Sequence, residues 1–468
     1  MPRLGSLWAC SALALVATSC TALLGIQRDI VIEIDSAIEL GATEPDLVGF
    51  NFQKGGADVC ELEPGFMRLD ADLGQIAPAP GVLELDDLLD KIRTASVDCG
   101  EPLVILSYMP EWLAGPGPDP SIAPPADYDA WQELVTDVVT ALATAPHPAT
   151  WFEVWNEPDI PIFWGGSLAA FSELAVRTHR AVAQVELATG LDLRIGGPGA
   201  ALSATDVSAA YLRAVADAGL TVDFLSWHSY PNLLLGPDGE EFTSNPLSNL
   251  AYPLISGINP FMSPEDHRRQ IRHQRQVASA ILGSDAATSL MLGITEWNMS
   301  SGGYDVRNDT SDAAAFAAAS LTVFEEEGLD LSAFFRSGSS GRAGDWGVVA
   351  PDGTRAPKWG AFQAFAASQG TRVAIRGSRP EHGLYARATK GANRADVVIS
   401  TYASAPQFRV HRRVTLTGLP AGVRTARLLA PGSSGFTPVD TGSSESPAVD
   451  VPAQSVLWVT VDTSPVDG

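Results

Sequence analysis

Two glutamates lie at the ends of short apolar runs, each beside an asparagine and a tryptophan. Glu157 belongs to the segment EVWNEPD at residues 153–159, and Glu296 belongs to ITEWN at residues 294–298. Cleavage of a glycosidic bond needs one neutral and one ionised carboxyl group on opposite sides of a sugar. The neighbouring tryptophans can raise the pKa of one carboxyl group by excluding water. The two segments therefore indicate a catalytic pair, and their spacing alone does not show which glutamate has the raised pKa.

The elements that must position this pair follow a regular alternation between about residue 45 and residue 370. Eight short apolar runs predict strands at 47–51, 66–70, 103–108, 151–156, 193–197, 222–228, 290–296 and 331–335. Helical patterns lie between them, at 83–97, behind Asp129, and at 168–188, 205–218, 264–282, 313–327 and 358–368. Several of the runs are continuously apolar, as in strands buried on both faces.

This alternation favours a (β/α)₈ TIM barrel over residues 37–369, an α/β fold whose reactive groups lie at the C-terminal ends of its strands. A doubly wound open sheet is the alternative. No GxGxxG or P-loop segment follows any predicted strand, so the nucleotide-binding folds lack their usual support.

Beyond residue 370 the helical periodicity vanishes, and short runs are separated by clusters of Gly, Pro, Ser and Asp. This pattern predicts a C-terminal antiparallel β-sandwich accessory domain at residues 370–468. The early run at residues 29–35 has strand alternation and is a candidate to join that domain.

Residues 1–20 predict a signal peptide with a lipobox-like end. Arg3 provides the positive start, an apolar run follows, and the segment closes with Ala17-Thr18-Ser19-Cys20. We expect Cys20 to be lipidated and the protein to be exported as an outer-membrane or cell-surface lipoprotein, with ordinary secretion or a periplasmic location as the alternative. No later run reaches the ~20 apolar residues of a membrane helix. We therefore expect the protein to be attached to a membrane only through the lipid on Cys20.

Cys60 and Cys99 are the two cysteines that remain beyond this segment, and outside the cytoplasm such a pair predicts a disulfide. Two buried free thiols are the alternative. The pair has no CxxC spacing, so zinc is not expected, and the sequence predicts no other metal site and no cofactor. With 55 acidic and 30 basic residues in 468, the formal charge of −25 repels phosphate backbones and argues against nucleic acid as a partner.

The motifs resemble a known group. WNEPD after the fourth predicted strand and TEWN after the seventh are similar to the signature of the clan A glycoside hydrolases, which are retaining (β/α)₈ enzymes. Within that clan the chain most resembles family 39, the group of β-xylosidases and α-L-iduronidases, and segments 108–113, 223–231 and 353–359 also match. The resemblance implies that Glu157 is the general acid/base, Glu296 the nucleophile, and that Asn156 bonds the sugar 2-hydroxyl.

The resemblance also implies supporting roles. His228 and Tyr230 would orient the nucleophile, and the charge of Arg68 would hold a site carboxylate ionised. The expected sugar-stacking residues are Trp112, Trp297 and Trp346. The structural alternatives are a core histidine, a packing tyrosine, an arginine that braces the barrel through an ion pair, and core tryptophans. Residues 51–53 and 339–346, after the first and eighth strands, do not identify the sugar.

The expected function is a retaining glycoside hydrolase acting on oligo- or polysaccharides, β-xylosidase-like by default. The alternatives are an endo-acting exopolysaccharide glycosidase or an arabinofuranosidase of the same clan, and a catalytically idle glycan-binding lipoprotein. Outside the site, we expect His267 and His273 at the surface and residues 325–327 as a solvated helix end.

Overall fold

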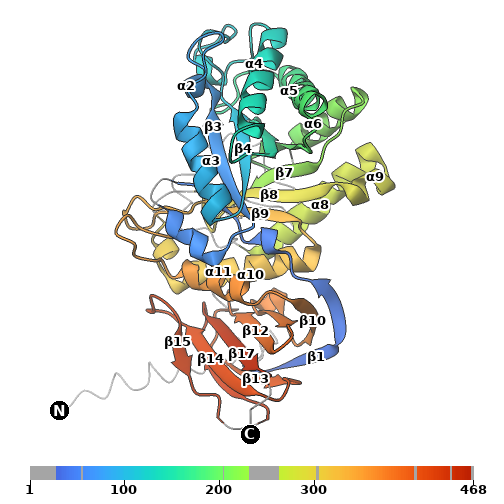
Figure 1. The fold of residues 1–468 in the computed structure, drawn as a ribbon. Helices are drawn as coiled ribbons and strands as arrows, with labels where there is room; N and C mark the ends of the chain where they lie inside the picture. The colour runs from blue at the N-terminus through green and yellow to red at the C-terminus, as the bar shows by residue number, and fades with distance from the viewer. Residues whose placement is uncertain are drawn as a thin grey trace, which may run out of the picture.

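A computed structural model describes residues 28–53, 56–203, 205–230, 263–301, 305–404, 408–442 and 445–464. The predicted signal peptide and Cys20 lie outside these residues. The described chain forms a closed barrel and a separate nine-stranded sheet that lies against one side of it (Figure 1).

The barrel consists of eight strands, each parallel to its neighbours. They are β2 (Phe50–Asn51), β3 (Phe66–Asp72), β4 (Glu101–Ser107), β5 (Trp151–Val154), β6 (Arg194–Ala200), β7 (Phe224–Ser229), β8 (Met291–Trp297) and β9 (Leu331–Phe334). The ring closes where Phe50 pairs with Phe334. Each strand overlaps one predicted run, so the TIM barrel is confirmed and the open-sheet alternative is wrong.

Helices surround the barrel (Figure 1). They are α2 (Leu73–Ile76), α3 (Asp86–Asp98), α4 (Tyr128–Ala143), α5 (Leu168–Thr189), α6 (Asp206–Asp217), α8 (Pro264–Leu282), α9 (Ser284–Ser289), α10 (Ser311–Glu327) and α11 (Lys358–Ala367). Helix α4 begins earlier than the sequence pattern predicts, because the Asp127 side chain caps it by accepting from the backbone N–H groups of Asp129 and Ala130.

The second sheet has the order β15-β14-β17-β12-β11-β10-β1-β13-β16. Its strands are β1 (Asp29–Ala42), β10 (Thr371–Arg376), β11 (Tyr385–Lys390), β12 (Arg394–Ser400), β13 (Arg412–Thr417), β14 (Val423–Leu429), β15 (Thr437–Val439), β16 (Ala448–Val451) and β17 (Val456–Asp462). The hydrogen bonds run through one continuous sheet, and its inward side chains share a single apolar core.

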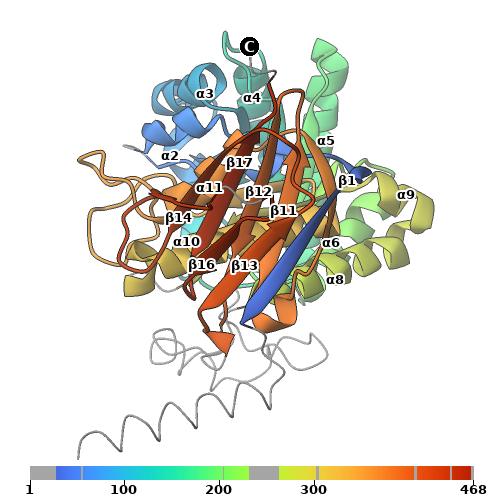
Figure 2. The same ribbon diagram turned by 90° about the horizontal axis from the view of Figure 1, so that it is seen from below.

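Strand β1 departs from the expected antiparallel pattern. It pairs antiparallel with β10 and parallel with β13, so the N-terminal strand lies inside the C-terminal sheet (Figure 2). It also continues to Ala42, past residue 37 where the sequence places the start of the barrel.

Helices α10 and α11 lie between the barrel and the sheet (Figure 1). Because α10 is covered on both sides, it is buried along almost its whole length, which explains its many alanines. The expectation of a solvated end at residues 325–327 is wrong for Glu325, which is buried in an ion pair with Arg387 of the sheet, Oε2 to Nε 3.2 Å.

The predicted disulfide between Cys60 and Cys99 is present, with Cα atoms 4.3 Å apart. It joins the 3₁₀ helix Ala57–Leu62 to the end of α3, just before β3 and β4, at the face of the barrel opposite the strand ends that carry the motifs. In the described part of the chain, no helix is long and apolar enough to cross a membrane.

Candidate active site

The two glutamates meet at the C-terminal mouth of the barrel. Glu296 belongs to β8, and Glu157 follows β5 by three residues. The backbone at Trp155 and Glu157 has φ values of 66° and 50°, a left-handed conformation that is costly for side-chain-bearing residues and gathers at functional sites. One carboxyl oxygen of Glu157 lies within 4.8 Å of one of Glu296.

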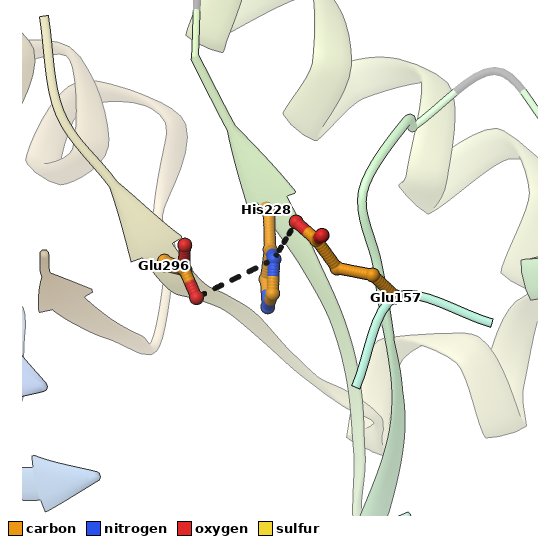
Figure 3. A group of neighbouring side chains, drawn as sticks. All are labelled: Glu157, His228 and Glu296. Carbon is orange, nitrogen blue, oxygen red and sulfur yellow. Dashed lines mark hydrogen bonds and ion pairs between the residues drawn. The ribbon is translucent and has the colours of Figure 1, made fainter. Parts of the chain in front are cut away.

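His228, from β7, lies between the two carboxyl groups (Figure 3). Its Nδ1 is 2.7 Å from Oε1 of Glu157 and 3.7 Å from Oε2 of Glu296. Its Nε2 is 3.2 Å from Nη2 of Arg68, and a guanidinium only donates hydrogen bonds. Nε2 must therefore accept, so the neutral imidazole carries its proton on Nδ1 and donates it to Glu157. Burial lowers the pKa of His228, which favours this neutral form.

Arg68, from β3, is the cation of the site, and its side chain is fully enclosed. Its Nε donates to Glu153 at 2.7 Å, and its Nη1 lies 3.2 Å from Oε2 of Glu296. It also donates to the side-chain oxygens of Asn51 at 2.8 Å and Asn156 at 3.0 Å. Burial opposes the charge of Arg68, but the two glutamates outweigh it and raise its pKa. Arg68 therefore contacts residues from four other barrel strands or strand ends, β2, β5, β7 and β8.

Glu153 is a site residue that the sequence reasoning missed, although it lies in the same segment as Glu157. It is completely buried and accepts hydrogen bonds from Arg68 and, at 2.7 Å, from Thr295. Burial alone would raise the pKa of Glu153, but the Arg68 charge and the hydrogen bonds lower it. The signal was a single charge within an apolar strand, which requires a buried partner.

Glu157 and Glu296 have different surroundings. Burial raises the pKa of Glu157 to about 7, with Arg68 acting in the opposite direction. Glu296 instead accepts hydrogen bonds on both oxygens, from the Tyr230 hydroxyl on Oε1 and from Arg68 on Oε2. The first carboxyl is suited to hold a proton at neutral pH, and the second is oriented by two donors toward the space between them.

Asn156 is fixed in one orientation by two neighbours. Its side-chain oxygen accepts from Arg68, and its Nδ2 donates to the Tyr108 hydroxyl at 3.3 Å. Tyr108, which the sequence reasoning did not select, packs edge-on against Trp155. Arg68 and Tyr108 thus hold the side chain of Asn156 beside Glu157, and its bond to a sugar hydroxyl stays a prediction.

The three predicted stacking tryptophans have different environments. Trp297 follows Glu296 on β8 and therefore points to the opposite face, where it is fully buried and packs edge-on against Phe324 and Phe334. A sugar cannot reach it, so that prediction is wrong. Trp112 and Trp346 are half-buried and donate to backbone oxygens of Ala77 and Ser300.

Phe335 is an aromatic residue that the sequence reasoning missed at this mouth. It follows β9, is half-exposed and packs edge-on against Trp346, with ring centroids 5.3 Å apart.

Behind the site, His267 is fully buried and its Nδ1 lies 2.7 Å from the Ser229 hydroxyl oxygen, so the expectation that it lies on the surface is wrong. His273 is exposed, as expected.

Glu157, His228 and Glu296 are also close enough to hold a metal ion. The guanidinium of Arg68, however, already contacts His228 and Glu296 at 3.2 Å and places a full positive charge beside them. That charge repels a divalent cation from this position. The arrangement fits an acid–base pair better than a metal site.

A closed (β/α)₈ barrel with paired glutamates after its fourth and seventh strands has the arrangement that cleavage of a glycosidic bond requires. The family model described as Glycosyl hydrolases family 39 matches residues 69–241. A β-xylosidase of Geobacillus stearothermophilus is 25% identical over 297 residues, which cover 61% of this chain and 54% of that protein. The chain thus spans about half the length of this curated relative. These matches support the assignment of the chain to glycoside hydrolase family 39.

Solved structures show the same fold over nearly the whole chain. A glucosidase from Croceicoccus marinus has a TM-score of 0.69 at 16% identity and covers 93% of this chain and 99% of its own. A monomeric β-xylosidase from Caulobacter crescentus CB15 has a TM-score of 0.68 at 20% identity, covering 93% and 100%. The GH39 enzyme from Xanthomonas axonopodis pv. citri has a TM-score of 0.67 at 18% identity, covering 93% and 98%.

Proposed function

We propose that this protein is a retaining glycoside hydrolase that removes β-linked xylose or a similar sugar from oligosaccharides. Glu157 is the general acid/base and Glu296 the nucleophile. The observation that supports this most directly is the spacing of the pair, whose nearest carboxyl oxygens lie within 4.8 Å. Retaining enzymes hold their carboxyl groups roughly 5–5.5 Å apart, whereas inverting enzymes need roughly 6.5–9.5 Å to admit a water molecule.

In the first step, Glu296 attacks the anomeric carbon while Glu157 donates its proton to the leaving oxygen. A covalent bond forms between Glu296 and the sugar, and the bond to the leaving group breaks. The raised pKa of Glu157 keeps the proton available near pH 7. The hydrogen bond from His228 engages Oε1 of Glu157, so Oε2 is the oxygen left to carry and deliver this proton.

In the second step, Glu157, now ionised, takes a proton from water as that water attacks the anomeric carbon. The bond between the sugar and Glu296 breaks, and the sugar leaves with its original configuration. Asn156 bonds the 2-hydroxyl, an interaction that strengthens as positive charge develops on the ring. Tyr230 and Arg68 stabilise the departing carboxylate of Glu296.

The β-xylosidase relative supports xylose as the sugar. A panel of aryl glycosides, including β-xyloside, β-glucoside, α-L-arabinofuranoside and α-L-iduronide, tests this, with Glu296→Ala as the matched control. We expect the protein to hydrolyse the β-xyloside faster than any other glycoside of the panel. Preferred turnover of arabinofuranoside would select the arabinofuranosidase alternative, and no turnover of any glycoside would select a glycan-binding role.

Exo action is part of the proposal, and xylotetraose distinguishes it from endo action. An exo enzyme releases xylose and xylotriose first, whereas an endo enzyme releases xylobiose early.

We also propose that the protein is exported and that Cys20 carries lipid. Mass spectrometry of the native protein should show a diacylglyceryl group on Cys20, and an unmodified chain that begins beyond Cys20 would indicate ordinary secretion.

A further inference from the structure

Asp70 lies two residues beyond Arg68 on β3, a spacing that places both side chains on the same face of the strand. Arg68 points into the barrel, where it contacts Glu296 and Asn156. Inward residues of a barrel form layers, and each later residue of this face lies nearer to the C-terminal mouth. Asp70 therefore lies above Arg68, on the wall of the opening through which a sugar enters.

The carboxyl group of Asp70 is reached by solvent and yet surrounded by protein. Its side chain is exposed, although the surrounding protein raises its pKa to about 6, with the neighbouring charge of Asp72 as the second cause. A group on the wall of a recess has both properties, because protein crowds it from the sides while the front stays open. Its position in a recess distinguishes Asp70 from an ordinary surface carboxylate.

The recess is that of the candidate active site. The charge of Asp70 acts on Tyr108 of the next strand end: burial is the main cause of the raised pKa of that phenol, and Asp70 is the second. The Tyr108 hydroxyl accepts a hydrogen bond from Asn156 at 3.3 Å. The Ser107 hydroxyl, on the residue just before Tyr108, lies 3.5 Å from Oδ1 of Asp70. Asp70, Tyr108 and Asn156 therefore follow one another around the mouth from β3 past the end of β4 to the end of β5.

The acceptor positions of Asp70 are largely unused within the described residues. Its one hydrogen bond there is from the Ser107 hydroxyl, at 3.5 Å, and no described arginine or lysine forms an ion pair with it. Arg68, the nearest site cation, is engaged by Glu153 and Glu296. A carboxylate with free acceptor positions beside a sugar site can bind ring hydroxyl groups, which are donors.

We propose that Asp70 is a specificity-determining residue that accepts a hydrogen bond from a ring hydroxyl other than the 2-hydroxyl of a neutral sugar. This inference rests on the proposed glycosidase function and adds a second point of sugar recognition to it. Asn156 holds the 2-hydroxyl side of the ring, and Asp70 holds the side beyond Tyr108, so the 3-hydroxyl and the 4-hydroxyl are its two possible partners.

The test compares the wild-type protein and Asp70→Ala on 4-nitrophenyl β-xyloside and on its 3-deoxy and 4-deoxy analogues. Asp70→Ala should lower kcat/KM for the parent xyloside about 10- to 100-fold. For the one analogue that lacks the bonded hydroxyl, the wild type and the variant should agree within about twofold, because the interaction is already absent. Asp90→Asn is the control: it removes a carboxylate charge from helix α3 on the outside of the barrel, where the exposed side chain pairs with Arg93, and it should change kcat/KM less than about threefold.

The possible results separate the role of Asp70 from the glycosidase function. Loss by the same factor on all three substrates would mean that Asp70 supports the fold or the charge of the site, and would overturn the proposal. Activity of Asp70→Ala equal to the wild type on the parent xyloside would also overturn it, while leaving the glycosidase function intact. Absence of wild-type turnover on every aryl glycoside would overturn the proposed function, and this inference with it.

Discussion

His228 places its Nδ1 2.7 Å from Oε1 of Glu157 while its Nε2 lies 3.2 Å from Nη2 of Arg68. The imidazole therefore connects Glu157, the proposed general acid, to the arginine that orients Glu296, the proposed nucleophile. Because Arg68 is a donor only, the proton of the neutral imidazole faces Glu157 and leaves the second oxygen of that carboxyl for the substrate. The contacts of one histidine and one arginine thus give Glu157 and Glu296 the different surroundings that their proposed roles require.

The pH dependence of catalysis should follow Glu157. Its pKa of about 7 means that the acid form is lost as the pH rises through 7. For a substrate with a poor leaving group, kcat/KM should fall about tenfold per pH unit above that value. A 2,4-dinitrophenyl glycoside needs no protonation, so its rate should stay level over the same range. A fall of equal steepness for both substrates would assign the titration to another group.

Stability should depend on Glu157 in the opposite sense to a usual carboxylate. Its pKa of about 7 in the folded protein lies above the usual value of 4.5 for a glutamate, so the folded protein binds more protons between these values and loses stability as the pH rises through that window. Glu157→Gln removes this loss and should stabilise the protein by about 1–3 kcal/mol above pH 7, with little effect below pH 4.5. Thermal unfolding at pH 4.5 and pH 8 measures this, and an equal effect at both pH values would contradict it.

Removing Arg68 should damage the fold as well as catalysis. Arg68→Met leaves Glu153 enclosed without its cationic partner, with hydrogen bonds such as that from Thr295 but no compensating charge, which costs about 3–5 kcal/mol. The double variant Arg68→Met, Glu153→Gln removes that charge and should recover much of the thermal midpoint but not the activity, since Glu296 keeps the Tyr230 donor but still lacks the Arg68 donor. If the double variant is no more stable than the single one, the buried pair does not act as described.

Chelation should leave the activity unchanged, because the charge beside Glu157, His228 and Glu296 is provided by Arg68. The rate on an aryl glycoside after prolonged dialysis against EDTA checks this. A loss that zinc or another divalent cation restores would instead assign the three residues to a metal site.

The sequence predicts the barrel and its two candidate catalytic glutamates because both depend on local patterns. Buried strands read as apolar runs, and WNEP and TEW lie at strand ends regardless of tertiary detail. The contacts of Arg68 depend on barrel closure, which brings β3 beside residues up to 228 positions away in the chain. Only the three-dimensional structure shows that the positive charge of Arg68 is paired with Glu153 rather than exposed to solvent.

Other differences arise where one element meets another. The sequence alone could have ruled out Trp297 as a sugar-stacking residue, because strand alternation places its side chain on the face opposite Glu296. The burial of His267 could not have been predicted from the sequence. Its helix has polar residues on several sides, and the aromatic residues that cover it, Phe316 and Phe324, come from α10. The parallel pairing of β1 with β13 likewise joins segments almost 400 residues apart and has no local signal.

Azide should distinguish the two glutamates. Glu157→Ala should still form the covalent intermediate from a 2,4-dinitrophenyl glycoside, and azide should speed its breakdown to a glycosyl azide of retained configuration. Glu296→Ala should lose almost all turnover, and azide in the vacated space should give the inverted product. The configuration of each azide product, read by NMR, checks both roles, and an inverted product from Glu157→Ala would exchange them.

Trapping the covalent intermediate is the most direct test of the central claim. A 2,4-dinitrophenyl 2-deoxy-2-fluoro-β-xyloside slows both steps but keeps the good leaving group, so a retaining enzyme accumulates its glycosyl ester. We expect one sugar per protein, attached to the peptide that contains Glu296, with no labelling of Glu296→Ala. A label on Glu157, or an unlabelled protein that turns over ordinary β-xylosides with inversion, would contradict the assignment of Glu296 as the nucleophile.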